Sequence, residues 1–312
     1  MDVILHVGAH RTGTTTLQQT LHHNHQRLKA NKVEYWAPQR TRAGLFDGLI
    51  KAADRVSPQV TAQARRANQQ IEDELQALSK AGVKTLIVSE ENMLGSIPAS
   101  VTTERLYPDA VRRVARLRPA FADRCARIGL AIRSYDQLWT SMISFTVKRS
   151  GRVPDADQIA GLVDQPRRWR DVIRELRVAF PRAEIQVWPF EGMVDAPHDV
   201  IARLTGRSLP VPLDPVEVVH NPAPDIHALR DAVERGPCAG HLTRLAEWNS
   251  GRWMPFTEPQ RTKMRADYAE DIAWLRSDPG PAIRYIESPE DLVGPTEEER
   301  GVRHDEGQRR VG

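Results

Sequence analysis

A glycine-containing loop near the start of the chain has the composition of a phosphate-binding site. Residues 8–16 read GAHRTGTTT, and Gly8 and Gly13 have the spacing of the pattern G-x-x-x-x-G-K-[ST], in which backbone N–H groups and the first turn of a helix hold phosphate. Thr14 replaces the lysine of that pattern, and Arg11 is the nearest cation. Since this lysine normally reaches the β- and γ-phosphates, the stretch predicts a phosphate-binding loop but argues against an ATPase or GTPase. The alternative is a turn before a helix that binds no ligand.

An arginine and a serine lie on either side of a predicted helix start. Arg133 ends the apolar stretch 126–134, and Ser141 follows eight residues later. Ser134 and Gln137 have the spacing of a capping box, which predicts that a helix begins there. A guanidinium group suits a doubly charged phosphate, and the start of a helix adds a positive dipole end. The alternatives are a surface salt bridge for Arg133 and a solvated hydroxyl for Ser141.

Two adjacent glutamates lie at the end of a predicted strand. Glu90 and Glu91 follow the apolar run TLIVS. Because neighbouring side chains at a strand end point to opposite sides, only one of the two should face a cleft and be a candidate for a general base. The alternative is that both are solvated or cap the following turn. His10, within the glycine loop, is a further candidate base, although packing within the loop is the simpler interpretation.

The elements that would carry these residues alternate between strands and helices. Short apolar stretches predict strands at residues 2–7, 32–36, 83–92, 126–134 and 183–191. Helical spacing predicts helices from Thr14 onward and at residues 58–81, 109–118, 134–149 and 166–180. This order predicts an α/β fold with a P-loop-type parallel sheet of four to five strands flanked by helices. Sheets of this kind bind ligands at the C-terminal ends of their strands, where the loop, the arginine and the glutamates all fall.

The pattern changes from about Pro210. Prolines cluster there, and afterwards only helical spacing is found, at residues 227–246 and 258–275. The charged stretch from residue 288 predicts a mobile tail. The predicted units are the α/β domain 1–209, a helical C-terminal extension 210–287 packed on it, and the tail 288–312.

The bulk composition narrows the class of protein. The 312 residues are 40% hydrophobic and 27% charged, with a formal net charge of +3. That charge suits an anionic ligand but is too small to indicate nucleic acid. Two cysteines, no signal-like N-terminus and no long apolar stretch predict a cytoplasmic protein without a membrane span. His22, His23 and His25 lack partner ligands, so no metal site is predicted.

The motifs resemble those of sulfotransferases. The stretch GAHRTGTTTLQ is similar to their 5′-phosphosulfate loop, P-K-x-G-T-T-x-L, with Arg11 at the lysine position and His10 at the proline position. The direct matches are Gly13, Thr14, Thr15 and Leu17. The stretch AIRSYDQLWTS resembles the second signature, R-x-P-x-D-x-x-x-S, and retains Arg133 and Ser141 while departing at the proline and aspartate. The resemblance covers about residues 2–206, and the family's late R-K-G loop is not recognisable.

The resemblance implies transfer of a sulfuryl group from 3′-phosphoadenosine 5′-phosphosulfate (PAPS) to a hydroxyl or amine of a small molecule or glycan, without a metal. It implies that Arg133 and Ser141 hold the 3′-phosphate. The residues it implies at the 5′-phosphosulfate are Arg11, Thr12, Gly13, Thr14, Thr15 and Thr16. Bacterial members often carry Ser-x-Glu at the base position, which selects Glu91 ahead of Glu90, with Arg11 as the cation on the leaving group.

Two other functions stay open at this point. One is a P-loop nucleotide kinase or NTPase, which would need Mg²⁺ and an acidic residue to hold it. The other is a nucleotide-binding module of the same fold that does not catalyse a reaction.

Overall fold

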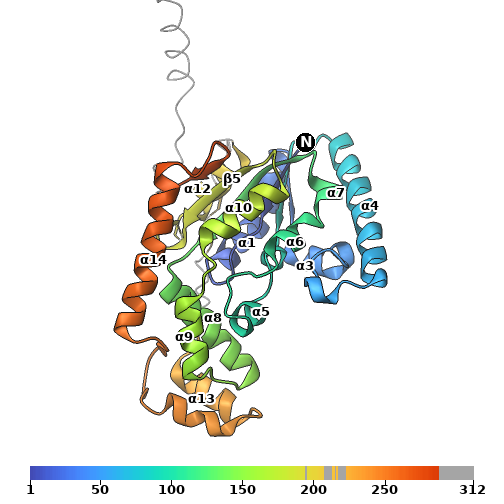
Figure 1. Cartoon of the computed structure of the whole chain (residues 1–312). Helices are drawn as coiled ribbons and strands as arrows, with labels where there is room; N and C mark the ends of the chain where they lie inside the picture. Colours follow the sequence, from blue (N-terminus) through green and yellow to red (C-terminus); the bar gives the residue numbers. More distant parts are fainter. Residues whose placement is uncertain (194, 207–212, 215, 217–222, 288–312) are drawn as a thin grey trace, which may run out of the picture.

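The computed structural model describes residues 1–193, 195–206, 213–214, 216 and 223–287, and contains a single six-stranded parallel sheet. The strands lie in the order β2-β3-β1-β4-β5-β6 (Figure 1). Their bounds are β1 Asp2–His6, β2 Val33–Trp36, β3 Thr85–Ser89, β4 Cys125–Ile132, β5 Glu184–Pro189 and β6 Ile283–Tyr285. The predicted α/β class and the five predicted strands are confirmed. The sixth strand, β6, is a three-residue addition that the sequence does not reveal, because three residues carry no usable periodicity.

Helices cover both faces of the sheet, which explains why the centres of its long strands are mostly apolar. On one face, α1 (Thr14–His23), α2 (His25–Ala30) and α12 (Pro197–Thr205) pack on side chains such as Ile4 and Ile87. The other face is covered by α4 (Pro58–Lys80), α6 (Ala110–Ala115), α7 (Arg118–Phe121), α8 (Tyr135–Ser150), α10 (Trp169–Ala179) and α14 (Glu258–Ser277). The short helices are α3 (Pro38–Arg40), η1 (Thr41–Leu45), η2 (Ala53–Arg55), η3 (Glu91–Met93), α5 (Ile97–Thr102), α9 (Ala156–Asp164) and α11 (Phe190–Met193).

The predicted helices are found, with differences in detail, and the helix expected from Thr14 onward is divided into α1 and α2. The helix expected at 109–118 is shorter and is followed by α7. At the start of α8 the capping box does not form, because the Ser134 hydroxyl donates to the Asp136 carboxylate at 2.6 Å instead of accepting from the backbone. None of the helices in the described residues combines the length and the apolarity that crossing a bilayer requires.

The region after residue 222 is built into the rest of the molecule. The helix predicted at 227–246 is divided into α13 (Ile226–Glu234) and η4 (Ala239–Leu245), with Pro237 between them. In Figure 1, α13 lies beside α8, and α14 runs along the edge of the molecule. The strand β6 pairs with β5. The predicted tail 288–312 and most of the proline cluster lie outside the described residues.

A buried carboxylate joins α14 to the helices behind the sheet. Asp271 is fully buried, and its Oδ2 accepts a hydrogen bond from the Tyr135 hydroxyl and one from the Trp169 backbone N–H at 3.2 Å. Its Oδ1 accepts from Arg170 Nε at 2.6 Å. Burial raises the pKa of Asp271, and these donors together with the Arg170 charge oppose that rise. Because each donor comes from α8 or α10, Asp271 fixes three helices relative to one another.

We predict that Tyr135→Phe lowers the free energy of unfolding by about 1–3 kcal/mol, since it leaves buried Asp271 one donor short. Tyr268→Phe is the matched control, because the Tyr268 ring packs against Tyr135 at 6.1 Å but its hydroxyl has no hydrogen-bond partner among the described residues. Urea unfolding of the two variants measures the difference. Equal losses in both would contradict a role for the Tyr135–Asp271 bond.

Candidate functional site

The glycine loop joins β1 to α1 at the C-terminal edge of the sheet. Gly8 and Gly13 have φ angles of 41° and 74°, and Arg11 also has a left-handed backbone, with φ 68°. A Cβ atom on Gly8 would lie 2.7 Å from the Thr14 hydroxyl oxygen, so only glycine fits there. The hydroxyls of Thr12 and Thr14 both donate to the carbonyl of Ala9, at 2.6 and 3.1 Å. These two predicted ligand residues therefore also hold the loop in shape.

The three predicted residues Arg11, Arg133 and Ser141 lie together. Arg11 Nε donates to Ser141 Oγ at 2.8 Å, and Arg133 Nη1 donates to the Arg11 carbonyl at 3.0 Å. Ser141 is only 2% exposed. The structure thus brings the loop, the end of β4 and the second turn of α8 to one point, as the motif spacing requires. The Arg11 guanidinium extends from the loop toward α8, where it joins the Arg133–Ser141 pair.

A third arginine belongs to the same cluster. Arg252 follows Gly251 in the segment before α14, and its Nη1 donates to the Gln137 side chain at 2.9 Å. Burial lowers the pKa of Arg11, and the charge of Arg252 lowers it further. Burial also lowers the pKa of Arg133; Glu191 opposes this change, and the charges of Arg252 and Arg11 add to it. Arg252 is not predicted from the sequence, because the residues around it match no recognisable motif. The pair Gly251-Arg252 in a loop is the one feature that could have indicated it.

The arginine cluster has limited compensation by acids in the described residues. Glu191 Oε1 lies 3.5 Å from Arg133 Nε, and the Asp136 carboxylate is already bound by Ser134 and by Arg265. The other face of the Arg133 guanidinium lies over the Phe190 ring, 4.6 Å from its centre. Asp136 and Glu191 oppose part of this positive charge. A cluster of three guanidinium groups suits an anion with more than one negative charge.

The two predicted glutamates differ sharply in their surroundings. Glu90 has no exposed surface, and its carboxylate accepts hydrogen bonds from Thr41 Oγ1, Arg42 Nε and Nη2, and Asn92 N and Nδ2, at 2.7–3.0 Å. Five donors bind the Glu90 carboxylate, and solvent does not reach it. Glu90 therefore holds Arg42 in place and is not positioned to take a proton from a substrate. This placement corrects its role as the alternative base.

Glu91 keeps access to solvent, with its side chain 20% exposed. Its Oε1 binds Arg42 Nη2 at 2.6 Å, and its Oε2 accepts from Gln18 Nε2 at 3.2 Å. Burial raises the pKa of Glu91, but the Arg42 charge and the hydrogen bonds outweigh burial and lower it. The carboxylate is therefore ionised at neutral pH and able to accept a proton. His10 packs within the protein, where its backbone N–H and its Nδ1 both contact the Tyr107 hydroxyl, at 2.8 and 3.2 Å.

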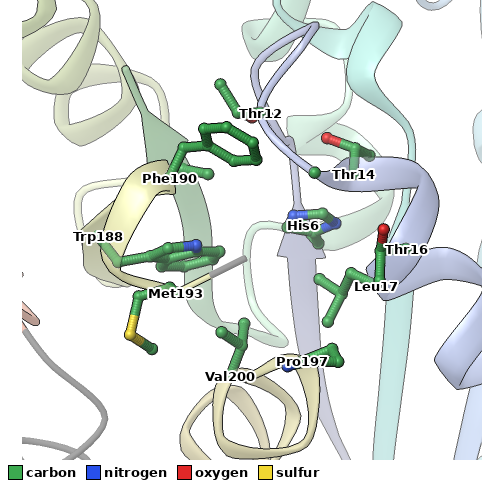
Figure 2. A pocket seen from close by; sticks show the side chains of 12 residues that line it. His6, Thr12, Thr14, Thr16, Leu17, Trp188, Phe190, Met193, Pro197 and Val200 are labelled. Carbon is green, nitrogen blue, oxygen red and sulfur yellow. The ribbon is translucent and has the colours of Figure 1, made fainter. Parts of the chain in front are cut away.

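A narrow hollow lies next to the loop (Figure 2). Thr12, Thr14 and Thr16 line one side of it, and Thr15 does not contribute. Opposite them are the aromatic and apolar side chains of Trp188, Phe190, Met193, Pro197 and Val200. His6 lies on the floor, with Nδ1 2.8 Å from the hydroxyl of Ser89. The hollow thus joins hydroxyl groups of the loop to apolar surfaces that suit a flat ring.

Comparison with known proteins gave no match, whether with family models, curated protein sequences or solved structures. Within the described residues, no group of three or more His, Cys, Asp or Glu side chains is arranged to hold a metal.

We predict that acid lowers the stability of the protein partly through His6. Burial lowers the pKa of His6 from 6.5 to about 4. Between these values the unfolded chain binds a proton that the folded chain does not, so the free energy of unfolding falls as the pH drops from 6.5 toward 4. The contribution is at most about 3 kcal/mol and vanishes above pH 6.5.

Urea unfolding at pH 7 and pH 4.5 measures this effect. His6→Gln should lose less stability on acidification than the wild type, whereas the exposed control His22→Gln should lose as much as the wild type. The same pH dependence in the wild type and His6→Gln would contradict the prediction.

Proposed function

We propose that the protein is a sulfotransferase that moves the sulfuryl group of PAPS to a hydroxyl or amine of a small molecule or glycan. The observation that carries the proposal is the convergence of Arg11, Arg133 and Ser141 beside the glycine loop, joined by Arg252. PAPS has a 5′-phosphosulfate and a separate 3′-phosphate. A loop of backbone N–H groups and a cluster of three arginines provide two distinct places for these two anions.

The proposed arrangement assigns each part of PAPS to one part of the site. The loop amides and the N-terminus of α1 would hold the 5′-phosphosulfate. Arg133, Ser141 and Arg252 would hold the 3′-phosphate, with Arg11 between the two sites. The adenine ring would lie in the hollow between the loop threonines and the aromatic residues Trp188 and Phe190.

The chemistry proposed is a single in-line displacement. The acceptor oxygen attacks the sulfur atom as its proton passes to the Glu91 carboxylate, and the bond between sulfur and the 5′-phosphate oxygen breaks. Adenosine 3′,5′-bisphosphate leaves with one additional negative charge on its 5′-phosphate. Arg11 and the loop N–H groups stabilise that charge, which lowers the barrier.

A P-loop kinase or NTPase is a less suitable assignment for two reasons. The loop contains no lysine. The acid at the end of β3, Glu90, is bound by Thr41, Arg42 and Asn92 and does not face the loop. A nucleotide-binding module without activity has the same pocket, and only an assay of transfer separates it from the enzyme.

We predict that Arg133→Ala and Arg252→Ala each reduce the affinity for adenosine 3′,5′-bisphosphate by about 10- to 100-fold, the loss typical of a hydrogen bond between charged groups. Affinity for adenosine 5′-monophosphate should change by much less, because it lacks the 3′-phosphate. Calorimetry with both nucleotides measures this, with Arg149→Ala on the exposed end of α8 as control. Equal or better binding of ATP by the wild type would reject the sulfotransferase assignment.

We predict that Glu91→Gln leaves the affinity for adenosine 3′,5′-bisphosphate within about two-fold of wild type and reduces sulfuryl transfer by 10²–10⁴-fold, the usual contribution of a general base. Transfer from labelled PAPS to a panel of phenols, sugars and amines measures it. Transfer by Glu91→Gln at the wild-type rate would remove Glu91 as the base. Tight nucleotide binding by the wild type without transfer to any acceptor would favour the binding module.

A further inference from the structure

A chain of hydrogen bonds runs from Glu91 to the floor of the hollow and fixes the protonation of His6. It begins at the Glu91 carboxylate, which only accepts hydrogen bonds when ionised. The Gln18 amide lies 3.2 Å from it, and must therefore present its NH₂ group to Glu91. The same Nε2 atom lies 3.1 Å from the Ser89 hydroxyl oxygen, and it can only donate to that oxygen. Ser89 is thus an acceptor toward Gln18.

Among the described residues, the hydroxyl proton of Ser89 has one partner left. Ser89 is fully buried, and its other contact is His6 Nδ1 at 2.8 Å. The Ser89 hydroxyl therefore donates to Nδ1, which must be the unprotonated nitrogen of the ring. Burial keeps the imidazole neutral at physiological pH, so its single proton is on Nε2.

The protonated nitrogen faces the hollow. Nδ1 is directed toward Ser89 on β3, the neighbour of β1 on one side. The opposite side of the ring faces β4 and β5, from which Trp188 comes, and the two rings lie nearly parallel at 14° with centres 6.0 Å apart. Figure 2 shows the imidazole of His6 between Thr14 and Trp188 on the floor of the hollow. A single N–H donor is thus presented among largely apolar side chains.

A donor in such surroundings stabilises a ligand that carries an acceptor and penalises one that does not. The ring nitrogens of a nucleobase are acceptors of this kind, and the flat ring matches the aromatic lining. Phe190 connects the two parts of the site, since it lines the hollow and also contacts the Arg133 guanidinium. A base in the hollow therefore has its phosphates within reach of the loop and the arginine cluster.

We propose that His6 is a base-selecting residue, whose Nε2–H donates a hydrogen bond to an unprotonated ring nitrogen of the purine bound in the hollow. This inference rests on the proposed function, because it assumes a purine nucleotide in the site. It adds a specificity determinant from β1 whose state is set by Ser89, Gln18 and Glu91.

The test compares adenosine 3′,5′-bisphosphate with its 1-deaza, 3-deaza and 7-deaza analogues, in which one ring nitrogen at a time is replaced by C–H. Calorimetry at pH 7.5 with the full chain should show one analogue binding about 10-fold or more weaker than the parent, and the other two within about three-fold. His6→Phe keeps an aromatic ring but has no donor, and should bind all four nucleotides with similar affinity. His22→Gln is the control and should retain the wild-type discrimination.

A second measurement requires no variant. In ¹⁵N-labelled wild-type protein, the histidine nitrogen shifts identify the tautomer, and His6 should carry its proton on Nε2, with that signal shifting when the parent nucleotide binds. A proton on Nδ1 would overturn the inference. So would equal binding of the parent and all three analogues, a result that leaves the proposed function intact. No binding of the parent nucleotide would overturn the proposed function, and the role of His6 with it.

Discussion

The site depends on holding three guanidinium groups close together at one edge of the sheet. Arg11, Arg133 and Arg252 come from distant parts of the chain, and the charge of Arg252 lowers the pKa of both of the others. Such a cluster is unfavourable unless other bonds fix it and an anion compensates it. Hydrogen bonds through Ser141, the Arg11 carbonyl and Gln137 connect the three arginines to the junction of β4 and α8. The loop conformation and the path of the C-terminal segment both depend on that junction.

The junction is itself supported from behind the sheet. The Trp169 indole donates to the Arg133 carbonyl at 2.8 Å, and the Trp169 backbone N–H contacts Asp271 in α14. Arg265, also in α14, binds the Asp136 carboxylate in the first turn of α8. Through these bonds α14 contributes to the geometry of Arg133. This dependence explains why the chain after residue 222 packs closely on α8 and α10, and why β6 continues the sheet.

The sequence predicts the helices and strands well. It predicts which distant residues come together only where those residues belong to a known motif. Strands such as β1 and β3 are predicted because they are short and have apolar centres, as strands buried on both faces do. Arg133 and Ser141 are found because they match the arginine and serine of the signature that the sequence resembles. Arg252 and β6 are not, since their roles come from contacts with residues about a hundred positions away in the sequence. The difference between Glu90 and Glu91 is likewise set by Arg42, whose position depends on the fold of residues 38–45.

The position of the proposed base follows from the same helix that begins at the phosphate loop. Gln18 lies in the second turn of α1, and its amide contacts both Glu91 and Ser89. On the other side, Arg42 binds Glu91 and is itself held by buried Glu90. The carboxylate is thus fixed relative to the loop by rigid elements and not by a flexible segment. In-line transfer requires the acceptor oxygen, the sulfur and the leaving oxygen to be aligned within a fraction of an ångström, and only such a connection between base and loop maintains that alignment.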